Sequence, residues 1–333
     1  MATLSVTNPT LLDVIKATDP DGSVSAVAEI LNETNEILDD MTMIEGNLAT
    51  GHRTTIRTGI PMPTWRMLYG GVQPTKSTRA QITDSCGMLE AYGEVDVEAA
   101  DLNGNTAAFR LDEDRAHIEG MTQTAANTLF QGDESLNAER FTGFNVRFND
   151  LSAPNADNII DAQGTGNDNA SLWLIGWGTN TVHGIYPKGS KAGLSMDDKG
   201  QVTLQDVDGA GGRMEAYMTH YKWKLGLTVR DWRYVVRICN IDRSALTPDA
   251  STGANLPILM FQAEQLIPNM AGARFAWYAD RGIATTIMQQ AALGTKSSTL
   301  TWADVGGRKT LMTPTGLPLR RTDALAVDEA RVV

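Results

Sequence analysis

Histidine and cysteine are the side chains that most often bind metals or act as nucleophiles, so their spacing is the first test for chemistry. Neither an HExxH helix motif nor a pair of CxxC motifs is present, and no histidine has ligand spacing to Cys86 or Cys239. The sequence therefore predicts no metal site, and it predicts two buried free thiols rather than a disulfide. The histidines are His52, His117, His183 and His220.

Glycine-rich and acidic turns are the next candidates, because they can hold phosphate groups or hard cations. Residues 164–166 and 209–212 are glycine-rich, but neither stretch is followed by the helix start that a phosphate cradle requires. The acidic turns at residues 197–200 and 206–209 do not match the twelve-residue calcium loop, and Asp and Gly are common in ordinary surface turns. A GxSxG nucleophile elbow is also missing. The sequence therefore predicts no catalytic residue, no cofactor and no enzymatic activity.

Tryptophan is the remaining residue type with binding potential, since seven indole rings could stack on sugars or bases. Burial in cores or subunit contacts is the alternative for most of them, because aromatic rings contribute large contact areas there. One alternative function is a loop-rich glycan-binding protein or hydrolase that uses Trp173 and Trp177 with the acidic turns. The carboxylate pair of a glycosidase is not recognisable in the sequence, which weakens this hypothesis.

Charge is distributed unevenly along the first hundred residues. The arm at residues 1–49 is strongly acidic, whereas residues 51–83 contain basic residues and no Asp or Glu. Two explanations stay open: the basic segment folds back on its own arm, or it lies on an acidic surface of a neighbouring copy, where complementary charge sets the register. Aromatic residues are few in this segment, so stacking on nucleic acid is weakly supported. The residues predicted to contact a neighbouring subunit are Arg53, Arg57, Trp65, Arg66, Lys76 and Arg79.

One long amphipathic helix is predicted over residues 105–131. Its apolar residues recur at spacings of seven, three, four and four, which places them on one face. Acidic residues at positions 112–114 fall in its first turns and complement the positive end of the helix dipole. Gly132 stands where a left-handed C-cap is expected. The residues of the apolar stripe are Leu111, Ile118, Met121, Ala125 and Leu129.

The other predicted elements are shorter. Residues 51–97 predict a long projecting hairpin with a turn at Gly70 and Gly71, and the arm before it predicts a helix that begins after Ser23. A strand is predicted from Phe144 onward. Further predictions are short strands in the loop-rich residues 151–212, the strongest strand at residues 214–230, an apolar element at residues 232–241, helices at residues 258–267 and 281–293, a hairpin with a closing strand at residues 301–319, and a fraying polar tail at residues 323–333.

Composition limits the class of protein. A chain of 333 residues can bury most of the surface that its unfolded state exposes, as one large domain or two subdomains. Its formal net charge of -12 argues against a dedicated DNA- or RNA-binding module. It has no signal-peptide pattern and no apolar run near eighteen residues, so we expect a protein made in the cytosol that neither is secreted nor spans a membrane. Many strands, an acidic arm and a projecting hairpin without catalytic groups predict an assembly protein.

Stretches spread along the whole chain resemble one family. They are ATLSVTNPTLLDVIKATDPDG at the start, RTGIPMPTWRMLYGGVQPTKSTRAQITD in the hairpin, LTVRDWRYVVRICNID after the strongest strand, and KTLMTPTGLPLRRTDAL near the end. With the order of arm, hairpin, long helix and loop-rich α/β portion, the chain resembles the major capsid proteins of short-tailed double-stranded DNA bacteriophages. That family has the Hong Kong-97-type capsid fold.

The resemblance implies an α+β fold divided by region. It implies an N-arm at residues 1–49, an extended loop at residues 50–97 that lies over the adjacent subunit, a peripheral domain at residues 98–149 and 300–333 with a spine helix at residues 105–131, and an axial domain at residues 150–299. It further implies self-assembly through pentamers and hexamers into an icosahedral shell that encloses the phage double-stranded DNA genome without sequence-specific binding. The implied location is the virion capsid, after assembly in the host cytoplasm.

The resemblance leaves partners and one alternative function open. A cement or decoration protein, a scaffolding protein and a portal are compatible with the family. No residue identifies a Lys-Asn cross-link between subunits, so shell stability is expected to rest on non-covalent contacts. The shell protein of a cytosolic encapsulin-like nanocompartment shares the fold and is the alternative function. A neighbouring cargo gene, in place of portal and terminase genes, would distinguish it.

Overall fold

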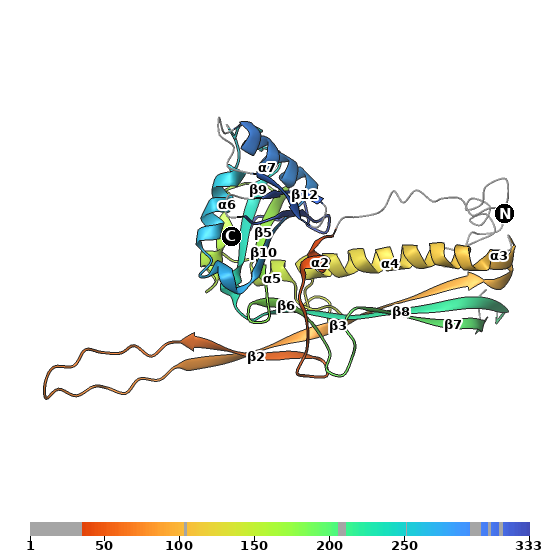
Figure 1. Ribbon diagram of the computed structural model, residues 1–333, viewed down its shortest axis with the longest axis horizontal. Helices are drawn as coiled ribbons and strands as arrows, with labels where there is room; N and C mark the ends of the chain where they lie inside the picture. Colours follow the sequence, from red (N-terminus) through yellow and green to blue (C-terminus); the bar gives the residue numbers. More distant parts are fainter. Residues whose placement is uncertain are drawn as a thin grey trace. The chain divides into compact units, whose positions relative to one another are not determined.

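The computed structural model describes residues 35–102, 105–205, 211–250, 252–293, 301–305, 308–312 and 316–333. The chain forms two compact units, whose elements are labelled in Figure 1. The described part of unit 1 comprises Met88–Ala126 and Gly193–Lys224, and unit 2 comprises Thr34–Gly87, Asn127–Ala192 and Leu225–Val333. The helix α4 (Thr106–Gln131) and the strands β3 (Thr78–Asp96) and β8 (Arg213–Val229) contribute residues to both units. The mixed helix and sheet architecture predicted from the sequence is confirmed.

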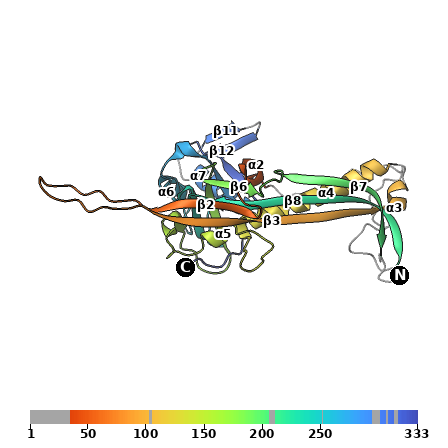
Figure 2. The same cartoon turned by 90° about the horizontal axis from the view of Figure 1, so that it is seen from below.

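The described part of unit 1 contains three strands, the short helix α3 and most of the long helix α4. The strand β7 (Leu194–Gln205) pairs antiparallel with β8, and β8 neighbours β3 in the sheet. The short helix α3 (Val97–Asp101) leads from β3 toward α4, and the Asp96 carboxylate caps it by accepting a hydrogen bond from the Glu98 amide at 2.8 Å. Figures 1 and 2 show α4 along one face of these strands.

Polar contacts as well as apolar packing hold α4 to the strands of unit 1. Arg110 donates to the Asp198 carboxylate on β7 at 2.7 Å, and its guanidinium lies 4.9 Å from the centre of the Tyr217 ring. The Tyr221 hydroxyl on β8 donates to the Asp114 carboxylate. Burial and this carboxylate raise the pKa of Tyr221. A small apolar cluster formed by Val95, Ala100 and Phe109 lies at the α3 end.

Unit 2 is built on a central sheet with the order β13-β10-β5-β6-β8, to which β9, β4 and β1 are added. The strands β9 and β10 flank β5 antiparallel, β1 lies parallel to β6, and β4 lies parallel to β9. All nine residues of β5 are buried, which explains the apolar run at residues 172–177 that forms most of the strand. The bounds are β1 Met43–Glu45, β4 Ile159–Asp161, β5 Asn169–Trp177, β6 Val182–Tyr186, β9 Val235–Asp242, β10 Arg274–Ala279 and β13 Leu319–Arg321.

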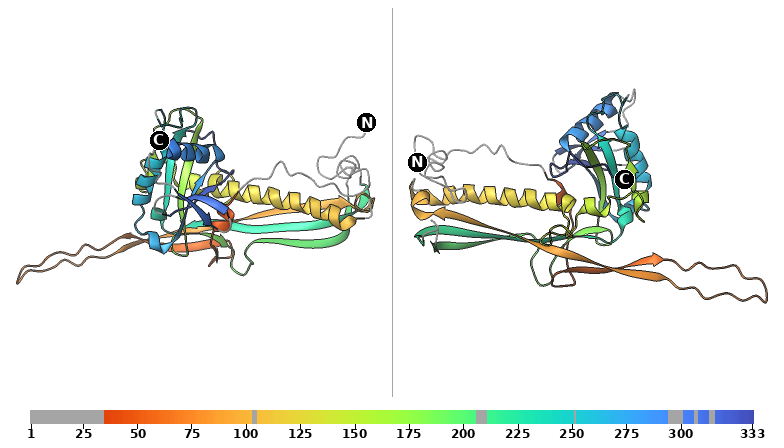
Figure 3. Two further views of the ribbon diagram at one scale, coloured as in Figure 1. Left: turned by 45° about the horizontal axis from the view of Figure 1, so that its top comes forward. Right: turned by 180° about the vertical axis from the view of Figure 1, so that it is seen from behind.

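Two helices cover one face of the sheet of unit 2, as Figures 1 and 3 show. They are α6 (Leu256–Gln265) and α7 (Arg281–Leu293); both were predicted from the sequence, the second from its helical spacing. Asn255 caps α6 by accepting from the Ile258 amide, and Pro257 stands in its first turn. The buried side chains between these helices and the strands include Leu256, Met260, Ile283 and Ile287 from the helices and Leu172, Leu174, Ile238 and Trp277 from the strands.

Short elements complete the described chain. They are the helices α2 (Ile37–Asp40) and α5 (Phe144–Arg147), the 3-10 turns η1 (Ala156–Asn158), η2 (Trp232–Tyr234) and η3 (Met270–Gly272), and the separate antiparallel hairpin of β11 (Thr301–Val305) and β12 (Arg308–Met312). The hairpin and closing strand predicted for residues 301–319 are confirmed. Most of the helix predicted after Ser23 lies outside the described residues. Of its described part only the single turn α2 is helical, and Asn35 before it forms a β-bridge with Thr322.

The prediction of a strand from Phe144 onward is wrong, because residues 144–147 form the helical turn α5. The spacing of Phe144 and Phe148 is that of one helical turn, and both rings turn toward Trp173. Ring centres of Phe144 and Phe148 lie 5.8 and 6.0 Å from that of Trp173, and Phe130 from the end of α4 joins the same cluster. Aromatic packing in three dimensions therefore overrides the apparent alternation in the sequence.

The tail at residues 323–333 was predicted to fray, and the structure contradicts this. Ala324, Leu325 and Val332 are buried, and Glu329 pairs with Arg237 at 2.9 Å. The prediction failed because the polar residues of the tail are matched by polar groups on β5 and β9, which its own composition does not reveal.

The long helix was predicted correctly, but three of its details were not. Its first turn begins at Thr106 and contains no acidic residue, so the residues at positions 112–114 lie further along the helix than predicted. The helix α4 spans Thr106–Gln131, and Met121, Ala125 and Leu129 are buried as expected, whereas Leu111 is 53% exposed. Near its start the helix buries Phe109 instead, in the apolar cluster of unit 1. Gly132 does not adopt the left-handed conformation expected of a C-cap. It is required because a Cβ there would meet the carbonyl oxygens of Phe141 and Thr128 at 2.3 and 2.5 Å.

Two glycines of this segment therefore differ in their response to alanine. Gly132→Ala is expected to lower the free energy of unfolding by about 2 kcal/mol or more, because backbone atoms block the added methyl group. Gly120→Ala is expected to raise it by about 0.5 to 1 kcal/mol, because Gly120 lies inside α4 and nothing lies within 4 Å of an added Cβ. Urea unfolding of both variants checks the pair, and equal shifts would contradict it.

Candidate assembly interface

The hairpin predicted for residues 51–97 has a paired stem and an unpaired tip. The strand β2 (Gly51–Gly59) pairs antiparallel with β3, from Gly51 opposite Ser85 to Gly59 opposite Thr78. Residues 60–77 form the tip, which extends away from the sheet of unit 2 in Figures 1 and 3. The turn comes before the predicted Gly70–Gly71 pair: Tyr69 has a φ of 67°, and the Gly70 amide donates to the Met67 carbonyl at 3.0 Å.

The stem brings three of the predicted contact residues onto one face. Arg53 and Arg57 are four residues apart on β2, and Arg79 stands directly opposite Arg57 on β3. Side chains two residues apart on a strand share a face, so all three project from the same side of the ladder, and all three are exposed. The Arg53 guanidinium donates to the Thr83 hydroxyl at 3.2 Å, and a shallow hollow of about 350 Å³ lies beside Arg57 and Arg79.

This face of the stem carries uncompensated positive charge. Like charges directly opposite each other on neighbouring strands are destabilising, and Arg57 faces Arg79 in that way. Among the residues that the structure describes, no carboxylate forms an ion pair with any arginine of the stem. In the described part of the arm, Glu36 and Asp40 form ion pairs. Both of them bind Arg320 of β13 and not the hairpin. The described arm therefore gives no support to the explanation that the hairpin folds back on it.

The tip contains the other three predicted residues, Trp65, Arg66 and Lys76, all exposed. The structure does not bring them together with the stem arginines. Trp65 is fully exposed, and several apolar neighbours that the sequence analysis did not single out are exposed with it. Exposed apolar groups gathered in one segment mark a surface that a partner covers. These further apolar residues are Ile60, Met62, Met67, Leu68, Tyr69 and Val72.

A signal for the apolar tip was present in the sequence. Residues 60–72 combine large apolar side chains with proline and glycine, and they show neither the alternation of a half-buried strand nor helical spacing. Such a segment cannot bury its apolar side chains within its own chain through regular structure. The sequence analysis used the charge of this segment and not its hydrophobicity, so it did not single out these exposed apolar residues.

The base of the hairpin is anchored by a buried polar group. Asp84 of β3 accepts from Arg147 of α5 at 2.8 Å, and the Asp84 side chain is only 3% exposed. Arg147 also donates to the carbonyls of Thr142 and Leu227. Breaking a buried ion pair by removing one partner is strongly destabilising, so this contact fixes where the stem joins unit 2.

Two histidines lie close together beside this anchor. The His52 and His183 rings are 5.8 Å apart edge to face. His183 is 1% exposed, and burial together with the nearby charge of His52 lowers its pKa from 6.5 to about 4. Burial also lowers the pKa of His52, and Asp84 opposes both shifts while Arg230 adds to them. Both histidines are therefore neutral in the folded protein at pH 7.

The lowered pKa predicts a loss of stability in mild acid. As the pH falls from about 6.5 toward 4, the unfolded chain binds a proton at His183 that the folded chain does not. The free energy of unfolding is therefore expected to fall by about 2 kcal/mol between pH 7 and pH 5 from this group alone. Urea unfolding at both pH values measures it. His183→Leu should lose correspondingly less over the same range, and an unchanged pH dependence in that variant would refute the assignment.

The residues considered first for chemistry are not assembled into a site. No group of three or more His, Cys, Asp or Glu side chains that could hold a metal ion occurs in the described part of the chain. Cys86 and Cys239 are both free thiols, of which only Cys239 is fully buried. Trp173 and Trp177 have exposures of 0% and 1%, so neither ring can stack on a sugar. No described helix is long and apolar enough to cross a membrane.

Comparison with solved structures relates the chain to bacteriophage shells. A chain in the structure of bacteriophage epsilon15 is 35% identical, with a TM-score of 0.79, and the match covers 100% of this chain and 99% of that one. Lower similarity is found to the bacteriophage JBD30 capsid, with 10% identity, a TM-score of 0.48 and coverage of 96% and 99%. The SrpI encapsulin of Synechococcus elongatus has 11% identity, a TM-score of 0.42 and coverage of 66% and 92%. A comparison with curated proteins found no match.

The fold, the projecting hairpin and the full-length similarity to the epsilon15 chain define the class as bacteriophage major capsid proteins with the Hong Kong-97-type fold. The family model for the major capsid protein GP7 matches residues 19–333. The chain belongs to the major capsid protein GP7 family, and its function is structural, as a component of the capsid shell of the virion. The family resemblance noted in the sequence is thereby confirmed.

Proposed function

We propose that this chain assembles through pentamers and hexamers into an icosahedral shell that encloses the double-stranded DNA genome of a bacteriophage. Membership of the major capsid protein GP7 family supports a shell of many copies. The net charge of -12 fits a wall that encloses nucleic acid without binding it sequence-specifically. Shell building requires only non-covalent contacts, so the proposal assigns no enzymatic activity to the chain.

The observation that carries this proposal is the hairpin. Its stem exposes Arg53, Arg57 and Arg79 on one face, and its tip exposes Trp65 among other apolar side chains. A neighbouring copy with carboxylates along the stem would relieve the repulsion between Arg57 and Arg79, and an apolar surface under the tip would bury the indole ring. Complementary charge sets the register of such a contact, and the buried aromatic ring supplies affinity. Arg66 and Lys76 add two further exposed positive charges in the tip.

The proposal also assigns a structural role to each region of the chain. Residues 1–49 serve as an N-arm, residues 50–97 as the extended loop over the adjacent subunit, and residues 98–149 with 300–333 as a peripheral domain with α4 as its spine. Residues 150–299 serve as the axial domain around the five-fold and six-fold positions. The bounds of β2, β3 and α4 support the loop and the spine, because both coincide with regular elements. The two compact units divide the other residues differently, since residues 193–205 and 211–224 group with most of α4, and residues 316–333 group with the strands of the axial domain. A cement protein, a scaffolding protein and a portal are the proposed further partners.

Electron microscopy of negatively stained protein, with sedimentation of the same sample, tests the proposal. Uniform closed shells, or ring-shaped capsomers that close when a scaffold is added, are the expected result. A compact monomer that persists at high protein concentration would contradict the assembly function. Mass spectrometry of purified shells distinguishes the proposed function from the encapsulin-like alternative. A packaged enzyme cargo would contradict a shell that encloses a genome.

A further inference from the structure

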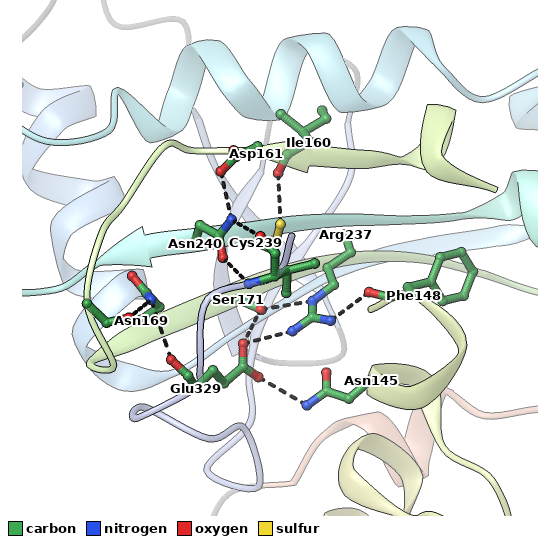
Figure 4. A network of polar contacts seen from close by, with 12 residues as sticks. Asn145, Phe148, Ile160, Asp161, Asn169, Ser171, Arg237, Cys239, Asn240 and Glu329 are labelled. Carbon is green, nitrogen blue, oxygen red and sulfur yellow. Dashed lines mark hydrogen bonds and ion pairs between the residues drawn. The ribbon is translucent and has the colours of Figure 1, made fainter. Parts of the chain in front are cut away.

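Residues 323–333, called the tail segment below, are held on unit 2 like a bound peptide. The Glu329 amide donates to the Asn169 carbonyl of β5 at 2.8 Å, and the Leu151 amide donates to the Val333 carbonyl at 3.1 Å. Figure 4 shows the polar groups around Glu329, which come from β5, β9 and the α5 region. The tail segment is thus recognised along its backbone, as peptides are in β-type recognition.

The side chain of Asn240 on β9 forms two hydrogen bonds with the backbone of one residue of the tail segment. Its side-chain amide donates to the Val332 carbonyl at 2.9 Å, and its side-chain oxygen accepts from the Val332 amide at 2.8 Å. Asp161 holds this amide group in place by accepting from it at 2.8 Å. Asn240 has a φ of 55°, a left-handed conformation that asparagine tolerates better than most residues. Both the residue type and the backbone at this position therefore serve the contact with the tail segment.

Arg237 of β9 supplies the charge that the tail segment neutralises. Its side chain is 3% exposed and lies against the Trp173 ring at 5.1 Å. The guanidinium donates to the Glu329 carboxylate at 2.9 Å, to the Ser171 hydroxyl at 3.0 Å and to the Phe148 carbonyl at 2.6 Å. Among the described residues, Glu329 is the sole carboxylate paired with Arg237. Asn145 and Ser171 donate to the same carboxylate, so its oxygens are satisfied on several sides.

The groups that bind the tail segment come before it in the sequence. The groups that bind Glu329, Val332 and Val333 come from residues 145–240, so they are synthesised first. Until Glu329 arrives, Arg237 is a cation on the central sheet without a carboxylate partner, and an unpaired buried charge is costly.

We propose that Asn169, Arg237 and Asn240 form a peptide-recognition site whose ligand is the tail segment, and that docking of this segment completes the folding of unit 2. The tail segment is a latch: β9 is already paired with β4 on one side and β5 on the other, and the tail segment supplies the polar partners of the Arg237 and Asn240 side chains. In a chain interrupted before Glu329, these two side chains lack those partners. This inference concerns the single subunit and does not depend on how subunits assemble.

Hydrogen exchange of full-length variants, followed by mass spectrometry, tests the latch. Glu329→Gln keeps the shape of the side chain but removes the charge that pairs with Arg237. We expect amides of the tail segment and of β5 and β9 to exchange faster by on the order of 100-fold or more, as the loss of a buried ion-pair partner implies. Asp328→Asn is the matched control, because Asp328 is the exposed neighbour and loses the same charge; its exchange should equal that of the wild type.

Three outcomes overturn the proposal. If Glu329→Gln and Asp328→Asn exchange alike, the Glu329 charge does not hold the tail segment. If only the tail segment exchanges faster and β5 and β9 do not, docking does not complete unit 2. A double variant, Arg237→Met with Glu329→Leu, removes both charges and should exchange more slowly than Arg237→Met alone; faster exchange in the double variant would show that the two residues are not coupled.

Discussion

Replacing Arg53, Arg57 and Arg79 together by glutamate is expected to abolish shell assembly while the subunit stays folded. The three side chains share one exposed face of the hairpin stem, and no described carboxylate pairs with them. Two glutamates facing each other at positions 57 and 79 would repeat the like-charge arrangement already present, so the free energy of unfolding should change by less than about 1 kcal/mol. In the proposed contact with a neighbouring copy, attraction would change to repulsion at three positions in every subunit.

Sedimentation of the triple variant beside the wild type measures this effect. Two like charges brought together at an interface lower the binding free energy by more than two opposite charges raise it. The same loss repeats at every equivalent contact of a closed shell. We therefore expect the shell or capsomer fraction to fall by about tenfold or more. A variant with lysine at the same three positions keeps the charge and should still assemble. Normal assembly of the glutamate variant would remove the electrostatic part of the proposed function.

Two tryptophans are expected to respond to alanine in opposite ways. Trp173 is 0% exposed and contacts Phe130, Phe144 and Phe148, so Trp173→Ala should lower the free energy of unfolding by about 3 to 5 kcal/mol. Trp65 is fully exposed at the hairpin tip, so Trp65→Ala should leave the free energy of unfolding within about 0.5 kcal/mol of the wild type. Assembly should nevertheless weaken in Trp65→Ala, because the proposed contact with a neighbouring subunit would bury the indole ring.

Urea unfolding of the monomer and sedimentation of the assembled protein separate the two tryptophans. Trp173→Ala lowers the unfolding midpoint, and Trp65→Ala weakens assembly at an unchanged midpoint. A destabilised Trp65→Ala monomer would show that the tip packs within its own chain. A folded Trp173→Ala protein that has lost a saturable glycan affinity would restore the glycan-binding alternative, which the burial of Trp173 otherwise opposes.

The sequence by itself determined the elements whose side chains follow a long, regular pattern. Helical spacing predicted α4 and α7, and alternation predicted β8. Strand-like composition on both sides of a turn predicted the hairpin. These predictions succeeded because a one-sided apolar pattern that lasts for many residues can be satisfied by only one type of element. The family resemblance also came from the sequence, since its motifs extend over the whole chain.

The tertiary structure alone decided the contacts between distant segments. The alternation of Phe144 and its neighbours favoured a strand, but Trp173 and Phe130 offered a site that only a helical turn fills. The polar tail segment was expected to fray, but Arg237 and Asn240 bind it. The three stem arginines came together because the register places Arg79 opposite Arg57. Each of these outcomes depends on a partner distant in sequence or on strand register, and local spacing carries information about neither.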